Sequence, residues 1–188
     1  MTSPTKHSLS IYFTFFFGCI WALVSNASEE FLNISITQTH YQIETAILIP
    51  KKPCVVFTAI TDFNHLSEFY PELQVSRVTK VDKAYITVEQ VLATKILNIP
   101  VTQKVLLKVV SDKKKLSLEQ ITGDFVSYTS VWKIEPFKNK SLLSISTEFR
   151  LPFFKSLFVS HRVLRKKQRA FVDHLLTQVK ERKYAKCE

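Results

Sequence analysis

The chain has 188 residues, 46% of them hydrophobic, and its formal net charge is +10. This length suffices for one domain with a proper hydrophobic core and excludes two domains of ordinary size. The positive charge favours anionic partners, such as acidic lipid surfaces, phosphates or nucleic acid.

Residues 1–27 do not read as part of that domain. Lys6 is their only formally charged side chain, and an apolar block of 16 residues, LSIYFTFFFGCIWALV, precedes the small-residue sequence SNA. This order is typical of a secretory signal, so we expect cleavage after Ala27 and export to the periplasm or the exterior. The block is shorter than the roughly 20 residues that span a bilayer. An uncleaved membrane anchor is the alternative. Export makes nucleic acid the least favoured partner.

Two cysteines, Cys54 and Cys187, would remain once the leader is removed. An exported protein tolerates a disulfide. However, the two positions are 133 residues apart and one lies beside the C-terminus. We therefore expect two unpaired thiols.

The body of the domain begins with a strand and two short helices. In residues 34–50, ISITQTHYQIETAILIP, apolar and polar positions alternate, which predicts one strand with one buried face. Pro53 then opens a first short helix. Asn64 is the candidate N-cap of a second one, which Pro71 ends.

Beyond Leu73 the hydrophobic pattern changes to period two for about 75 residues. Short hairpin connections separate the segments, which predicts an antiparallel meander. Gly123, the only glycine beyond the leader, falls between two of them, and we expect a positive φ or a bulge there. The predicted strands are 75–81, 85–97, 101–110, 116–121, 126–134 and 142–151.

Residues 153–186 contain neither proline nor glycine and predict one long amphipathic helix. Its apolar stripe includes Leu157, Leu164, Phe171 and Leu175. The elements together predict an α+β fold. A curved antiparallel sheet of about seven strands would wrap around the C-terminal helix, and the two short helices after the first strand would close one end.

Three segments in this order carry a resemblance to a known family: TDFNHLSEFYPEL (61–73), GDFVSYTSVWKIEP (123–136) and STEFRLPFF (146–154). Roughly residues 35–180 resemble the START-like, or helix-grip, superfamily (SRPBCC). The most similar branch contains polyketide cyclases/dehydrases and coenzyme Q-binding proteins, and also the ribosome-association toxins. The residues that match its structural motifs are Asp62, Phe69, Pro71, Gly123, Phe125 and Trp132.

The resemblance implies that residues 28–188 form a helix-grip domain with a hydrophobic cavity between the sheet and the C-terminal helix. Such cavities hold lipids, isoprenoids, quinone-like or polyketide-like molecules. The superfamily includes binders, transfer proteins, cyclases and hydrolases, so the fold does not decide the activity. We expect an exported binding or transfer protein. The alternative is a cyclase- or hydrolase-type enzyme, in which His161, Asp124 or Glu89 would act as acid or base.

Candidate ligand contacts lie on two strands and on the helix. Residues two apart on a strand share a face, and a few polar groups would orient a mostly apolar ligand. Equally, the strand residues could fill a core, and the polar helix residues could lie at the edge of the stripe. The cavity candidates are Tyr128, Ser130, Trp132, Ile145, Thr147, Phe149, His161, Leu164 and Gln168.

A basic run, HRVLRKKQR, occupies residues 161–169. Arg162, Arg165, Lys166 and Arg169 could form an ordinary solvated helix face, or a surface that docks on anionic headgroups. The sequence has no nucleophile elbow, P-loop, dinucleotide fingerprint or dense metal-ligand motif. We expect a monomer without metal or cofactor.

Overall fold

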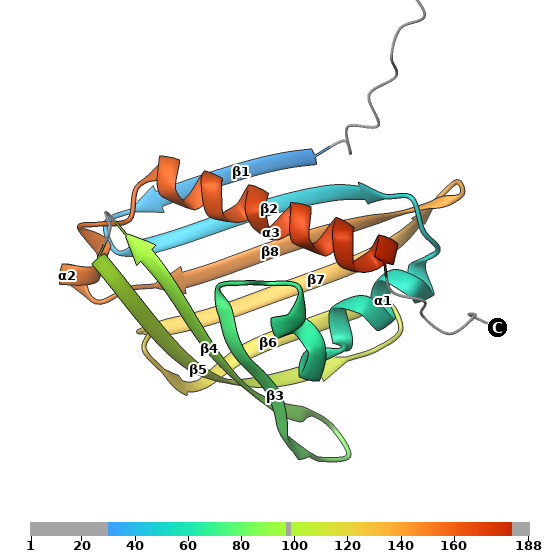
Figure 1. The fold of residues 1–188 in the computed structure, drawn as a ribbon, viewed down its shortest axis with the longest axis horizontal. Coiled ribbons are helices and arrows are strands. Elements are labelled where there is room, and N and C mark those ends of the chain that lie inside the picture. The colour runs from blue at the N-terminus through green and yellow to red at the C-terminus, as the bar shows by residue number, and fades with distance from the viewer. Residues whose placement is uncertain (1–29, 97–98, 182–188) are drawn as a thin grey trace, which may run out of the picture.

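One antiparallel sheet of eight strands curves around the C-terminal helix (Figure 1). The computed structural model describes residues 30–96 and 99–181. The strand order in the sheet is β1-β2-β8-β7-β6-β5-β4-β3. The strands are β1 (Glu30–Thr37), β2 (His40–Ile49), β3 (Leu73–Val81), β4 (Ile86–Ile96), β5 (Ile99–Ser111), β6 (Lys115–Gly123), β7 (Ser127–Phe137) and β8 (Lys140–Arg150). The helices are α1 (Pro53–Thr61), the 3-10 helix η1 (Phe63–Glu68), α2 (Phe153–Ser156) and α3 (His161–Glu181).

The predicted α+β, helix-grip architecture is confirmed, and the six strands of the meander correspond to β3–β8. One boundary prediction was wrong, because residues 34–50 belong to two strands. The chain reverses between Thr37 and His40, which pair with each other, and Gln38 takes a positive φ of 54° in the turn. The inward positions change from even numbers in β1, such as Ile34, to odd numbers in β2, such as Tyr41 and Ile43, so the alternation is interrupted at this turn.

The long C-terminal helix was also predicted as one element but forms two, α2 and α3. The backbone N–H of Val163 donates to the Ser160 hydroxyl (3.4 Å), so Ser160 acts as an N-cap for α3. On the other side of the break, the buried Tyr41 hydroxyl donates to the Ser156 carbonyl (3.3 Å) and holds the end of α2. Residues 182–186 of the predicted helix lie outside the described residues.

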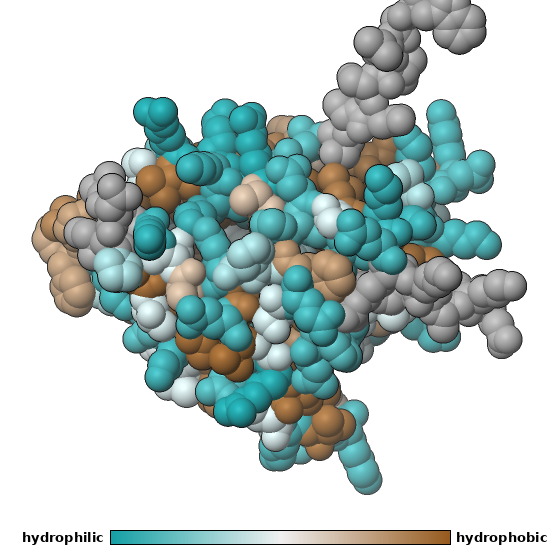
Figure 2. All heavy atoms as spheres, in the orientation of Figure 1, coloured by the Kyte–Doolittle hydropathy of each residue, from teal (hydrophilic) through white to brown (hydrophobic). Residues whose placement is uncertain are grey.

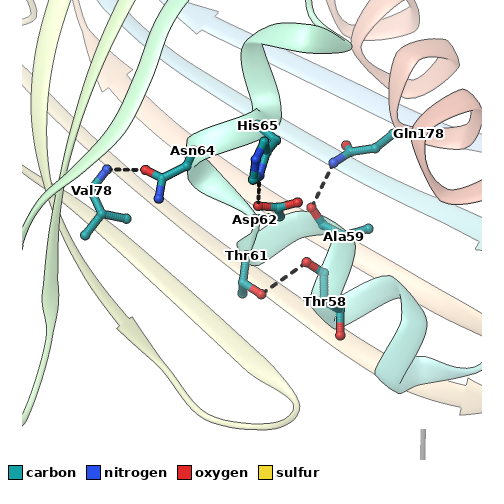
Figure 3. A network of polar contacts seen from close by, with 8 residues as sticks. All are labelled: Thr58, Ala59, Thr61, Asp62, Asn64, His65, Val78 and Gln178. Atoms are coloured by element: carbon teal, nitrogen blue, oxygen red, sulfur yellow. Dashed lines mark hydrogen bonds and ion pairs between the residues drawn. The ribbon is translucent and has the colours of Figure 1, made fainter. Parts of the chain in front are cut away.

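The helices α1 and α3 pack against each other over the sheet. Buried Val172, Leu175 and Val179 of α3 belong to the main core together with residues of α1. The Gln178 amide, which is fully buried, donates through Nε2 to the Ala59 carbonyl (3.1 Å), as Figure 3 shows. This bond joins the two helices with a polar group that is inaccessible to water.

The connection from α1 to η1 differs from the prediction in one detail. Asn64 does not cap η1; its Oδ1 accepts from the backbone N–H of Val78 (2.8 Å), which ties η1 to β3 (Figure 3). Asp62 lies at the cap position of η1, and its Oδ1 pairs with His65 Nδ1 at 2.6 Å. The Asn64 side chain therefore holds η1 against the sheet and does not cap the helix.

The expectation for Cys54 was wrong, because Cys54 is disulfide-bonded. Cys187 lies outside the described residues. Sequence spacing alone did not settle the state of Cys54, because only spatial proximity decides whether two thiols can bond.

Gly123 has a φ of 156°, and the positive φ predicted for it is confirmed. A Cβ at this position would lie 2.6 Å from the Lys104 carbonyl oxygen and 2.9 Å from Val105 Cα. The register between β5 and β6 also shifts here, because Leu106 and Leu107 pair with Thr122 and Gln120 and leave one residue over. The turn therefore combines a bulge with a close approach of two backbones.

A candidate ligand-binding cavity

A cavity of about 400 Å³ lies between the inner face of the sheet, the α1–η1 segment and α3. Its walls are mostly aromatic and aliphatic, and its polar groups are few. This composition is typical of small-molecule sites. The lining residues are Ile60, Phe63, Leu66, Tyr70, Pro71, Glu72, Leu73, Gln90, Leu92, Leu118, Tyr128, Trp132, Lys167, Gln168, Ala170, Phe171 and His174.

Phe171 is the centre of an aromatic wall. Its ring meets Trp132 of β7 edge-on, with centroids 5.7 Å apart and an interplanar angle of 81°. Tyr70, between η1 and β3, stacks on Phe171 at 5.4 Å and meets the His174 ring edge-on at 5.8 Å. These pairs are the preferred geometries of aromatic contacts. They join α3 to β7 of the sheet and to the connection between η1 and β3.

A short hydrogen-bond chain fixes the Trp132 side chain from behind. Trp132 Nε1 donates to Ser130 Oγ at 2.8 Å, and Ser130 Oγ lies 2.7 Å from Thr147 Oγ1. Ser130 is 1% exposed, so its hydroxyl is satisfied inside the wall. Burial raises the pKa of the Tyr128 phenol, and a hydrogen bond with Ser130 partly opposes this shift. The chain orients aromatic rings that face the cavity.

Lys167 and Glu72 stand at one edge of the cavity. The Lys167 ammonium donates to Glu72 Oε1 and to Thr94 Oγ1. Both charged residues line the cavity and also a neighbouring depression that includes Thr94, Pro100 and Val101. The ion pair therefore marks the boundary between the apolar cavity and this more polar depression. Both side chains are partly exposed, so the pair adds little to stability.

The predicted cavity residues divide into three groups. Tyr128, Trp132 and Gln168 line the cavity. Ser130, Thr147 and Ile145 lie behind the wall, in the hydrogen-bond chain or in the main core. The remaining three lie elsewhere: Phe149 and Leu164 in a second core cluster, and His161 exposed at the start of α3.

The second core cluster explains why Phe149 and Leu164 are not at the cavity. Phe149 stacks on Tyr41 with centroids 4.9 Å apart and an interplanar angle of 7°. Ile34, Ile43, Leu151 and Leu164 complete the buried part of this cluster near the α2 end. The inward face of α3 therefore serves two clusters in succession.

Sequence reasoning did not single out Lys167 and His174 as cavity residues. With Phe171 they are spaced four and three apart, which places all three on one helix side. The predicted stripe started from Leu157, which belongs to the segment before α3 and is 66% exposed.

The motif residues have structural roles around the cavity. Pro71 lines it, and the Phe69 N–H donates to the Leu66 carbonyl at the end of η1 (3.1 Å). Phe125 packs against Tyr128 at 5.4 Å and against Phe149 at 5.7 Å.

The three acid–base candidates of the enzymatic alternative are placed outside the cavity lining, as far as the described residues show. Asp124 Oδ2 accepts from the backbone N–H of Lys104 (2.7 Å) beside Gly123. Glu89 pairs with Arg77 at 2.6 Å. Between residues 30 and 181, leaving out 97–98, no group of three or more His, Cys, Asp or Glu side chains could hold a metal ion.

The four basic candidates for surface contact, Arg162, Arg165, Lys166 and Arg169, are all exposed on α3. Among the described helices, none combines the length and the hydrophobicity that a membrane crossing requires.

Known proteins show what this architecture is similar to. The sequence model of the family described as polyketide cyclase/dehydrase and lipid transport matches residues 49–176. No curated protein matches the chain by sequence.

Three solved structures share the fold. The Zhui aromatase/cyclase from Streptomyces sp. R1128 has a TM-score of 0.64 and 11% identity, covering 78% of this chain and 97% of its own. A STAR-related lipid transfer protein from Xanthomonas axonopodis has a TM-score of 0.62 and 8% identity, covering 80% and 99%. A START superfamily protein from Mycobacterium smegmatis has a TM-score of 0.56 and 12% identity, covering 73% and 93%. The family match covers more than half of the residues, and the helix-grip sheet and cavity accompany it, so the chain belongs to the polyketide cyclase/dehydrase and lipid transport family.

Proposed function

We propose that the protein binds a hydrophobic molecule, such as a lipid, an isoprenoid or a quinone-like compound, and carries it without chemical change. The observation that supports this function is the cavity itself. Its volume of about 400 Å³ lies at the lower end of the range for ligand sites, and aromatic rings dominate its walls. The Lys167–Glu72 ion pair is part of the lining and would orient the polar end of an otherwise apolar ligand.

Native mass spectrometry after mild purification tests this function. A co-purifying apolar molecule of defined mass, released on denaturation, is the expected result. Protein that stays ligand-free after isolation from its own host, and that takes up no fatty, isoprenoid or quinone probe, would refute the proposal.

We further propose that residues 1–27 are a secretory leader and that the mature chain is exported. The disulfide at Cys54 supports this localisation, because structural disulfides persist mainly in oxidising compartments. The leader pattern supports it independently. N-terminal sequencing of the exported protein should begin at Ser28, whereas an intact Met1 on a membrane-bound protein would favour the uncleaved anchor.

One observation favours the enzymatic alternative. His174 presents an imidazole at the cavity wall, and an imidazole can act as a general acid or base near neutral pH. If ligand-free protein hydrolyses an aryl ester or cyclises a polyketide-like substrate, and His174→Gln abolishes turnover while the exposed His65→Gln does not, the enzyme replaces the carrier.

A further inference from the structure

Four large apolar side chains protrude together at the α2 end of the molecule. Phe153, Phe154, Leu157 and Phe158 are 72%, 66%, 66% and 47% exposed, and we call them the apolar tip. Figure 2 shows hydrophobic side chains gathered at the end of the molecule where Figure 1 places α2. Phenylalanine and leucine are usually buried, and a contiguous exposed group of them marks an interaction site.

The fold holds the apolar tip outward. The Leu151 N–H donates to the Thr39 carbonyl (3.0 Å), and Tyr41 anchors Ser156 from below. The Ser156 hydroxyl in turn donates to the Phe153 carbonyl (2.6 Å). The space beneath is already filled by the second core cluster, which includes Tyr41, Phe149 and Leu164. The tip residues therefore have no interior site to occupy.

The chain segment that carries the apolar tip has charges of one sign. Residues 149–172 contain seven Lys and Arg and no Asp or Glu. Lys155 belongs to α2 itself, and Arg162 and Arg165 are exposed on the first turns of α3. This combination suits an anionic lipid surface, because the apolar side chains can insert into the membrane interface while the basic side chains contact the negative headgroups. Two copies joined tip to tip would bring like charges together, which is unfavourable.

A series of depressions leads from the apolar tip to the cavity. The first is lined by Phe154 and Phe158 together with Pro100, Val101 and Thr102 of β5. The second shares those three β5 residues and adds Lys167 and Glu72. Lys167 and Glu72 also line the cavity. The tip therefore stands at the outer end of a surface path whose inner end is the ligand site.

We propose that the apolar tip and the basic start of α3 dock the protein on an anionic membrane, with the path to the cavity facing the lipid. Docking goes beyond the proposed carrier function. Its experiment measures contact between the tip and lipid, whereas the experiment for the carrier function measures occupancy of the cavity. Failure of one proposal is thereby distinguishable from failure of the other.

A pair of tryptophan reporters tests the docking. Phe154→Trp places a fluorophore in the tip, and Phe31→Trp places one at an equally exposed site on β1. Phe31 serves as the control because it lies far from the tip. Thr37 is at the α2 end of the sheet, since it pairs with His40, which pairs with Arg150 beside α2. Phe31 is six residues along β1 from Thr37, which is about 20 Å in a strand. The fluorescence of the native tryptophans, measured on the wild-type protein, is subtracted. N-terminal sequencing records whether the leader is present, so that all variants are compared in the same form.

The vesicles are phosphatidylcholine with brominated chains, with and without phosphatidylserine. Phe154→Trp should shift to the blue and be quenched only with phosphatidylserine, and less at high salt, while Phe31→Trp should not respond. The proposal would be overturned by equal quenching of both reporters, by no quenching, or by quenching that does not depend on phosphatidylserine and salt.

Substitutions in the docking surface provide the quantitative test. Phe153→Ser with Leu157→Ser should weaken vesicle binding tenfold or more, and circular dichroism should show an unchanged fold. Arg162→Gln with Arg165→Gln should weaken binding by about fivefold for each charge. The matched control, Lys113→Gln with Lys114→Gln in the exposed β5–β6 hairpin, should leave binding unchanged. Light scattering that reveals a dimer dispersed by the tip substitutions would overturn membrane docking in favour of self-association.

Discussion

Phe171 of α3 meets Trp132 of β7 edge-on across the cavity, with ring centroids 5.7 Å apart. The contact joins the helix to the middle of the sheet. Both residues line the cavity, and Trp132 is in turn held by Ser130. Residues beside this pair therefore control how much space a ligand finds.

Ala170 lies beside Phe171 and lines the cavity, so Ala170→Trp should fill the space. We expect at least tenfold weaker binding of a fluorescent fatty probe, with a loss of about 1–3 kcal/mol in the free energy of unfolding from overpacking. Thr177→Trp, at an exposed position of α3, is the matched control and should bind normally. Unchanged probe affinity in folded Ala170→Trp would contradict this location of the ligand site.

Lys167→Met should open the boundary between the cavity and the neighbouring depression. Because the Lys167–Glu72 pair is partly exposed, the free energy of unfolding should change by less than about 1 kcal/mol. Ligand release should become several-fold faster in stopped-flow measurements, because the ammonium no longer ties Glu72 to Thr94. Lys180→Met, exposed in the last turn of α3, controls for the lost charge. Equal release rates in both variants would exclude the boundary role.

Gly123→Ala should destabilise the protein by about 2–4 kcal/mol, because the added Cβ meets backbone atoms and the positive φ disfavours a side chain. Urea unfolding measures the loss, and Thr122→Ala next to it should cost less than about 1 kcal/mol. A Gly123→Ala protein as stable as the parent would mean that the β5–β6 turn adapts without strain.

Burial raises the pKa of both Tyr41 and Tyr128 above the ordinary value of 10.0. The folded protein then retains these protons at a pH where the unfolded chain has lost them. Their stabilising contribution is complete below pH 10 and decreases as pH rises towards the folded-state pKa values. Unfolding midpoints measured upward from pH 9 should fall, and less steeply in Tyr128→Phe. The raised pKa values would be contradicted if absorbance showed that all tyrosines of the folded protein ionise completely near pH 10.

Local pattern was sufficient for most of the fold and for part of the site. Alternation with short charged connections predicted β3–β8, and two-residue spacing placed Tyr128 and Trp132 on the inner face, where they line the cavity. The prediction for α3 was right in type and in most of its inward stripe, because Gln168 and Phe171 line the cavity and Leu164 and Leu175 are buried. A hydrophobic period does not reveal how far along the helix the ligand site lies, so it could not show that Leu164 packs in the second core cluster while Lys167 and His174 line the cavity.

By itself the sequence determined the element types, the family, and the need for glycine at position 123, because these depend on local periodicity, motif order and backbone sterics. Only the tertiary structure decided which side chains share the cavity, that Cys54 forms a disulfide, and that Phe153 and Phe154 remain exposed. The physical reason is that these outcomes depend on which distant segments meet. Tyr41 and Phe149 fill the space under α2, and apolar residues that look like part of a buried helix stripe are left outside.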